Sequence, residues 1–294
     1  MSRAWISRLV FLAVLALLAG GVYWALRPRE IPTTPPTGAP KAGSCWAVDD
    51  PTAHQAFPWP GNPVDCAQPH TMEIFHVGQV DHALIREKDS KEGQNAAIAQ
   101  SLMYAQARRA CVVIASQYLG SAWRAARVQV VANWVKPADD GFYGCALAEV
   151  RDPAGKALVN RQSSLRGALT EGYSAPIAIN CVSRAGSADA LQYAACDAPH
   201  DGEYVGLYTV TPLDAPYDES AVKNTANRGC TQIALNYLGL TGGEGRTDLR
   251  TGYVGPGSKD DWLGSDQTYA CYLLVNEGKI KGTLKGLGAR PLPR

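Results

Sequence analysis

The chain has 294 residues, of which 46% are hydrophobic and 19% are charged, and its formal net charge is +1. This length accommodates two ordinary domains and an anchor, and the apolar content supports folded cores and argues against a disordered chain. A net charge near zero without a long basic block argues against nucleic acid as a partner.

The N-terminus carries an uncharged run from Leu9 to Leu26 with arginines on both sides. A helix over this run is about 27 Å long at 1.5 Å per residue, which is close to the thickness of a bilayer core. A cleaved signal peptide is the alternative, but the run is long for one and lacks a small-x-small site before a polar boundary. We therefore expect an uncleaved transmembrane helix at 9–26 in the cytoplasmic membrane, behind a cytoplasmic tail at 1–8.

Residues 27–43 form a linker in which five prolines lie between positions 28 and 40. Such a composition stays extended, because proline favours the polyproline conformation. We expect it to hold the folded part of the chain away from the membrane.

The elements of the first folded half follow from periodicity. An alternating stretch at Glu73–Asp81 predicts a strand, and apolar residues at helical spacing predict a helix over Gln94–Leu119 that ends at Gly120. Two further apolar stretches predict strands, and the turn residues after them predict that 157–169 forms the second arm of a hairpin. These two strands are expected at 128–135 and 143–150.

A second half repeats the first in the same order. The motif Cys66-Ala-Gln-Pro-His70 with Glu73 recurs as Cys196-Asp-Ala-Pro-His200 with Glu203, and residues 111–120 align without a gap with 230–239. Ordered matches of this kind indicate a tandem duplication into domains at 44–170 and 171–290. We expect each to be α+β, with short antiparallel strands packed on one main helix. In the second half, the main helix is expected within 219–240 and the last strand near 269–275.

Eight cysteines, four in each half, indicate disulfides and an oxidising compartment. Pairing within each half leaves three connectivities for four cysteines. We favour the connectivity that joins the opening segment to the Pro-His loop and the helix to the strand after it. The favoured pairs are Cys45–Cys66, Cys111–Cys145, Cys181–Cys196 and Cys230–Cys271. The folded part is then expected outside the cytoplasm.

A metal site is the competing use of these residues. Cys66, His70, Cys196 and His200 make a Cys2His2 set, but structural zinc sites usually contain closely spaced cysteine pairs, and C-x3-H from two separate domains fits poorly. We expect neither a metal nor a cofactor.

His70 and His200 are the histidines that recur, each followed by an acid three residues later, Glu73 or Glu203. They would serve either as base and orienting group of an enzyme, or as a structural latch or the edge of a binding surface. No serine, threonine or free cysteine recurs beside them as a nucleophile, and the hydrolase and phosphate-loop motifs are absent. We expect no enzymatic activity.

Aromatic residues near strand ends and loops are either core residues or contacts for a glycan or a partner protein. The set comprises Trp46, Trp59, Trp123, Trp134, Trp262, Tyr143, Tyr253 and Tyr269.

The pattern Gly-Ser-Cys45-Trp46, Cys66-Ala-Gln-Pro-His70 and a helix with Cys111 before Tyr143-Gly-Cys145 resembles the septum-formation-related domain. This family occurs in high-GC Gram-positive bacteria, typically on envelope proteins with one membrane anchor. Two departures stand out. Thr71 replaces an acid of the family motif, and Asn180-Cys181-Val182 replaces the family's glycine, acid, cysteine and aromatic residue.

The resemblance implies two copies of this domain and a role in septum formation and cell division. We expect a single-pass membrane protein whose extracytoplasmic domains bind an envelope protein or a cell-wall component. The alternative is a hydrolase or transferase acting on the cell wall through the two His/Glu pairs.

Overall fold

The computed structural model describes residues 39–48, 59, 62–90, 93–135, 141–186, 190–213, 215–240, 245–256 and 258–294. All of them belong to one compact unit, residues 36–294. The expected tail, the expected transmembrane helix and most of the linker lie outside the described residues. Within the described part of the chain, no helix has the length and apolar content needed to cross a membrane.

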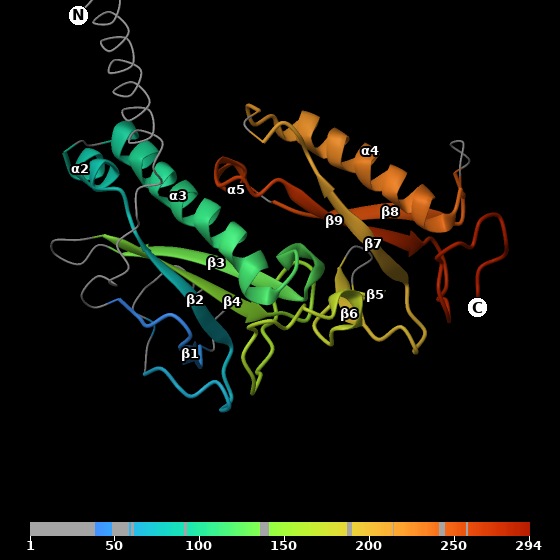
Figure 1. Cartoon of the computed structure of the whole chain (residues 1–294). Coiled ribbons are helices and arrows are strands. Elements are labelled where there is room, and N and C mark those ends of the chain that lie inside the picture. Colours follow the sequence, from blue (N-terminus) through green and yellow to red (C-terminus); the bar gives the residue numbers. More distant parts are fainter. Residues whose placement is uncertain are drawn as a thin grey trace, which may run out of the picture. The chain divides into compact units, whose positions relative to one another are not determined.

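The first half contains a four-stranded antiparallel sheet with the order β1-β2-β4-β3. Helix α3 (Gln94–Leu119) packs against one face of this sheet (Figure 1). The shorter helix α2 (His82–Ser90) packs on α3. The strands are β1 (Cys45–Trp46), β2 (Met72–Gln79), β3 (Val128–Val135) and β4 (Phe142–Glu149).

Helix α3 begins and ends at the predicted residues. Its buried side chains include Met103, Ala115 and Leu119, and they join Leu147 of β4 in the core beneath the helix. Gly120 ends the helix with φ 90°, in the left-handed region that glycine adopts without steric cost, and its N–H donates to the carbonyl of Ser116.

The sheet of the first half is buried on both faces. Successive residues of β3 alternate between two cores: Val130 packs under α3, and Val131 packs with Trp46 and Trp59 on the opposite face. Because both faces are covered, the strands carry few charged residues, which explains their apolar sequences.

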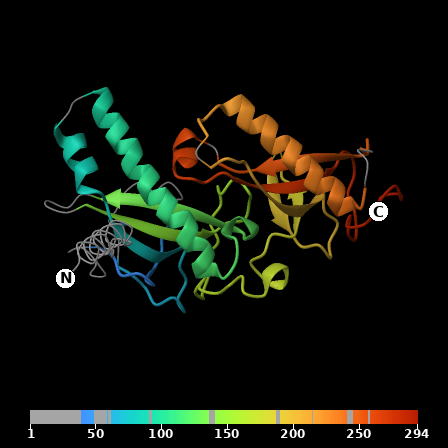
Figure 2. The same cartoon turned by 45° about the horizontal axis from the view of Figure 1, so that its top comes forward.

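The second half contains a five-stranded antiparallel sheet with the order β6-β5-β7-β9-β8. Helix α4 (Glu219–Leu238) packs against β7, β8 and β9, and Figure 2 shows α3 and α4 each lying across its own sheet. Asp218 caps the start of α4 by accepting the N–H of Ala221. The strands are β5 (Cys181–Arg184), β6 (Leu191–Ala194), β7 (Gly202–Thr209), β8 (Leu249–Val254) and β9 (Thr268–Val275).

The two sheets share irregular details as well as the order of their elements. The register of β2 shifts after Ile74, and that of β7 shifts after Tyr204, at corresponding distances from the two Pro-His motifs. Gly239 ends α4 in the left-handed conformation, as Gly120 ends α3. The α+β prediction with antiparallel strands packed on a main helix is therefore confirmed for both halves.

Four features differ from the prediction. Residues 157–169 do not form the second arm of a hairpin; they make two isolated bridges, Leu158 with Val150 and Arg161 with His70, and otherwise continue through bends and turns. The sequence pattern also missed α2, α5 (Lys259–Leu263) and the strand β6, all of which are short.

A buried ion cluster joins the two halves. Asp266 accepts from Arg108 Nη2 at 2.5 Å and from Arg124 Nη2 at 2.7 Å, and Asp261 lies 3.3 Å from Arg108 Nε. Burial alone lowers the pKa of Arg108, but the charges of Asp266 and Asp261 outweigh it and raise the pKa above its ordinary value. The guanidinium therefore stays charged, and the two halves are linked by paired charges.

Candidate functional site

The structure contains four disulfides, and their pairing is the favoured one. The first of each half joins the opening strand to the Pro-His loop, and the second joins the helix to the sheet. All eight cysteines are therefore consumed, so none is available as a free nucleophile.

The opening disulfides differ from the others in exposure. Cys45 and Cys181 are 0% and 1% exposed, whereas their partners Cys66 and Cys196 are partly exposed and exposed. All four cysteines of the helix-to-sheet disulfides are fully buried. Each opening disulfide therefore joins one buried cysteine to one that is partly or wholly exposed.

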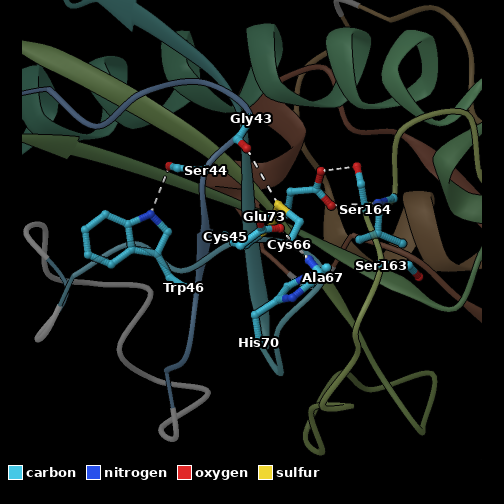
Figure 3. The surroundings of a disulfide bond; sticks show 12 residues. Gly43, Ser44, Cys45, Trp46, Cys66, Ala67, His70, Glu73, Ser163 and Ser164 are labelled. Atoms are coloured by element: carbon cyan, nitrogen blue, oxygen red, sulfur yellow. Dashed lines mark hydrogen bonds between the residues drawn. A yellow bond between two sulfur atoms is a disulfide. The ribbon is translucent and has the colours of Figure 1, made fainter.

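Glu73 lies directly opposite Cys45 in the pairing of β2 with β1 and is buried. Its Oε1 accepts the hydroxyls of Tyr118 and Ser164, both at 2.5 Å, and its Oε2 accepts the N–H of Leu165 at 2.6 Å. Figure 3 shows Glu73 beside the disulfide and turned toward Ser164. Glu73 thus ties together β2, the end of α3 and the segment after β4.

Glu203 of β7 repeats this arrangement. It lies opposite Cys181, and its Oε2 accepts the Tyr237 hydroxyl at 2.8 Å, the Thr283 hydroxyl at 3.2 Å and the Leu284 N–H at 3.0 Å. Glu203 Oε2 accepts all three hydrogen bonds, and Glu203 Oε1 faces the imidazole ring of His200.

His70 and His200 are both 0% exposed. In each, Nδ1 lies 2.8 Å from a backbone carbonyl two residues earlier and can only donate there, which leaves Nε2 with the lone pair in the neutral ring. Neither Nε2 has a hydrogen-bond partner among the described residues, although His200 Nε2 lies 3.9 Å from Glu203 Oε1. The backbone of each histidine also bridges to the segment after the last strand, at Arg161 or Ile280.

The tyrosines that donate to the two carboxylates are perturbed by their surroundings. Burial and the hydrogen bond to Glu73 raise the pKa of Tyr118. Burial raises the pKa of Tyr237 to about 12, with Glu203 adding to the increase and the Thr283 hydroxyl opposing it. Both phenols therefore stay protonated and remain donors over the whole physiological range.

The arrangement brings potential metal ligands together, but in a different set from the one weighed above. Ligand atoms of Cys45, His70 and Glu73 lie within 4.8 Å of one another, and so do those of Cys181, His200 and Glu203. Each group contains the buried, inner cysteine of the opening disulfide, Cys45 or Cys181. The Cys2His2 set considered from the sequence contained the outer partners, Cys66 and Cys196. Because each inner sulfur is held in a disulfide, each group offers a metal only one imidazole and one carboxylate, which does not match a zinc site.

Sequence reasoning found the histidines and acids but missed the donors that hold the acids. Tyr118 and Tyr237 occupy the same position in the aligned helices, and Ser164 and Thr283 also correspond. The statement that no serine or threonine recurs alongside the motif is therefore wrong. Both hydroxyls donate to the carboxylate, and the Ser164 oxygen also accepts the N–H of Arg166. The recurrence of these residues in the two halves was the signal that could have found them.

The departure at Thr71 has a local explanation. The Thr71 hydroxyl accepts the N–H of Val48 and donates to its carbonyl, whereas Asp201 in the second half accepts from the Arg184 backbone and guanidinium. Both side chains hold the chain next to the opening strand, one with a hydroxyl and one with a charge.

Most of the aromatic residues named above are core residues. Trp46, Trp59, Trp123, Trp262, Tyr143 and Tyr269 are all buried. Tyr253 is partly exposed, and the side chain of Trp134 is outside the described part. This favours the core interpretation for six of the eight.

A groove of about 810 Å³ runs along β3, the edge strand of the first sheet, and also contacts the end of β8. Volumes of roughly 300–1,000 Å³ are typical of ligand sites. Its lining is largely polar and includes Gln100, Tyr104, Arg124, Gln129, Asn133 and Asp260.

Two antiparallel sheets, each with a main helix, two disulfides and a buried carboxylate at the opening strand, define a disulfide-stabilised α+β protein. A family model described as septum formation matches residues 42–271, which is well over half of the chain and includes parts of both halves. The chain belongs to this septum formation family. Comparison with curated proteins and with solved structures found no match.

Proposed function

We propose that the protein is a membrane-anchored binding protein of the cell envelope that acts in septum formation. Two tandem copies of one domain would stand outside the cytoplasm and engage an envelope protein or a cell-wall component. The anchor would be the apolar run 9–26.

The repeated structural details support the two-copy part of the proposal. Both halves carry a disulfide from opening strand to Pro-His loop, a disulfide from helix to sheet and a glutamate held by a tyrosine hydroxyl. Two unrelated domains would have no reason to share these features in the same order. The family match is a single one, so the division at 170/171 stays a proposal.

The burial of the His/Glu pairs supports binding over catalysis. His70 and His200 are fully enclosed, and Glu73 and Glu203 are used by neighbouring hydroxyl and N–H donors. A general base that acts on a wall polymer must come within hydrogen-bond reach of it, directly or through one water. The arrangement therefore supports the role of a structural latch, a buried hydrogen-bonded group that holds neighbouring segments together.

The groove along β3 is the observation that carries the binding proposal. It offers amide, hydroxyl, guanidinium and carboxylate groups together with the edge strand of a sheet. Edge strands pair readily with an extended segment of another chain, and polar side chains around them supply selectivity.

Photo-crosslinking in dividing cells tests this proposal. A photoreactive amino acid replaces Gln100, which is exposed and lines the groove, or Gln117, an exposed glutamine of the same helix that does not line it. We expect a defined adduct with an envelope protein or wall fragment from position 100 and none from position 117.

Equal labelling at both positions, or none at position 100, would contradict the groove as the binding surface. The non-enzymatic part is checked separately by incubating purified full-length protein with isolated cell wall. Release of soluble wall fragments, abolished in a His70→Gln/His200→Gln protein that keeps its fold, would overturn it.

A further inference from the structure

We propose that the two opening disulfides, Cys45–Cys66 and Cys181–Cys196, are sites of thiol–disulfide exchange with an external dithiol. The proposal goes beyond binding at the groove and does not depend on it. It assigns the outer cysteine as the sulfur that is attacked, the inner cysteine as the leaving thiolate and the buried histidine as its proton donor.

The unequal exposure of the two sulfurs sets the direction of attack. Cys66 is partly exposed and Cys196 is exposed, whereas Cys45 and Cys181 are buried as the first residues of the opening strands β1 and β5. An incoming thiolate reaches only the outer sulfur, so the inner one must leave. The disulfides Cys111–Cys145 and Cys230–Cys271 are buried at both ends and offer no such access.

A thiolate released inside the protein needs a partner, because a buried unpaired charge is costly. The histidine supplies it. Nδ1 of His70 is held by a carbonyl, Nε2 has no hydrogen-bond partner among the described residues, and a ring nitrogen lies within 4.8 Å of Cys45 Sγ and a Glu73 oxygen. Sulfur, imidazole and carboxylate therefore lie together, as in sites where histidine controls a reactive cysteine.

The same group recurs in the second half, where Cys181, His200 and Glu203 make an equivalent set. His200 Nε2 also lacks a hydrogen-bond partner within the described structure. A histidine needed only to hold its loop would be satisfied by the Nδ1 contact and the backbone bridge. In both halves a buried histidine beside a disulfide has an Nε2 without a hydrogen-bond partner among the described residues, and those structural contacts leave this unexplained.

An external thiol gives up a proton, which Nε2 of His70 accepts on its lone pair. The thiol's sulfur forms a bond to Cys66 Sγ, the Cys45–Cys66 bond breaks, and its electron pair leaves on Cys45, which takes the proton from Nε2. The second thiol of the dithiol then attacks the mixed disulfide. The protein's disulfide is reduced by two electrons to two thiols, and the dithiol is oxidised to a disulfide. Re-oxidation by a disulfide compound is the reverse reaction.

Glutathione serves as the probe for the first step. Folded full-length protein is incubated with it, free thiols are alkylated, and each cysteine is assigned by mass spectrometry. We expect glutathione on Cys66 and Cys196, alkylated thiol on Cys45 and Cys181, and no reaction at the other four cysteines. Adducts on the inner cysteines, or reaction at all four disulfides together, would overturn the proposal.

The histidine is tested by the rate of that reaction in His70→Gln and His200→Gln. Because each protein retains one unaltered copy, the second opening disulfide is an internal control. Loss of the proton donor should slow release of the inner thiolate at the altered copy at least about tenfold. The rate at the other copy should be unchanged. A histidine with a purely structural role predicts the opposite, since loosening the loop speeds reduction, and an unchanged or faster rate therefore overturns the proposal.

Discussion

Glu73 of β2 and Tyr118 at the end of α3 are 45 residues apart, and the Tyr118 hydroxyl donates to Glu73 Oε1 at 2.5 Å. The same carboxylate holds Ser164 and Leu165, which follow the last strand of the sheet. One buried charge therefore organises three segments of the first half, and Glu203 does so in the second. A buried carboxylate is tolerated at this position because its donors satisfy it.

Replacement of Glu73 by glutamine should destabilise the protein. The glutamine amide keeps the shape of the side chain but removes its charge. Its NH2 group cannot accept the hydrogen bonds that the Tyr118 and Ser164 hydroxyls or the Leu165 N–H donate to the carboxylate. Hydrogen bonds to charged groups contribute about 1.5–3 kcal/mol, so we expect a loss of about 2–3 kcal/mol in the free energy of unfolding measured in urea.

Glu171→Gln is the matched control for that substitution, because Glu171 is exposed. A change within about 0.5 kcal/mol is expected there. Equal effects of the two substitutions would show that Glu73 is not a latch.

Tyr237→Phe should change how stability depends on pH. The folded pKa of Tyr237 is about 12, against an ordinary value of 10.0. As the pH rises, Tyr237 loses its proton in the unfolded chain before it does so in the folded protein. Its contribution to the free energy of unfolding is therefore complete below about pH 10 and is lost as the pH rises through the folded pKa. The wild-type unfolding free energy should therefore fall more steeply than that of the variant between about pH 10 and 12.

At neutral pH the same variant should lose about 1 kcal/mol, the contribution of one hydrogen bond. Unfolding in urea at each pH measures both effects. Parallel pH profiles for the two proteins would contradict the assigned role of the Tyr237 hydroxyl.

The ion cluster between the halves should depend on Asp266. Asp266→Asn leaves Arg108 and Arg124 without their shared carboxylate in a buried setting. Removing one partner of a buried pair costs about 3–5 kcal/mol. The comparison substitution is Asp248→Asn, because the ion pair of Asp248 with Arg246 is far more exposed. We expect it to lower the free energy of unfolding by at most about 1 kcal/mol. Differential scanning calorimetry of both variants distinguishes the two cases.

The helix-to-sheet disulfide should contribute strongly to stability. A Cys111→Ala/Cys145→Ala protein loses a bridge that spans 34 residues, and the chain-entropy model gives about 3–4 kcal/mol for a loop of this size. We expect a lowered denaturation midpoint with the sheet retained by circular dichroism. A midpoint that stays unchanged would mean that the fold constrains these residues without the bridge.

Local patterns predicted the regular elements well where burial alone decides. The bounds of α3 follow from apolar periodicity and from Gly120, whose missing side chain permits the left-handed end. The disulfide pairing followed from the shared order of cysteines in the two halves of the sequence. These features are short-range or repeated, so one sequence contains them.

The features that were missed depend on contacts across the fold. The turn residues before 157–169 suggested a hairpin arm, but the N–H of Leu165 is taken by Glu73 and the chain turns there instead. Tyr118 looks like an ordinary core residue in the helix until its hydroxyl is placed against a carboxylate 45 residues away. Neither relationship follows from spacing, because each joins residues from different elements.

The persistence of the four disulfides and the proposed binding to an envelope component both need the folded part of the chain to lie outside the cytoplasm. Reporter fusions after Arg29 and after Arg294 measure this directly. We predict activity from an alkaline phosphatase, which needs an oxidising compartment, at both positions and none from a reporter that works only in the cytoplasm. Activity of the cytoplasmic reporter at either position would contradict the account.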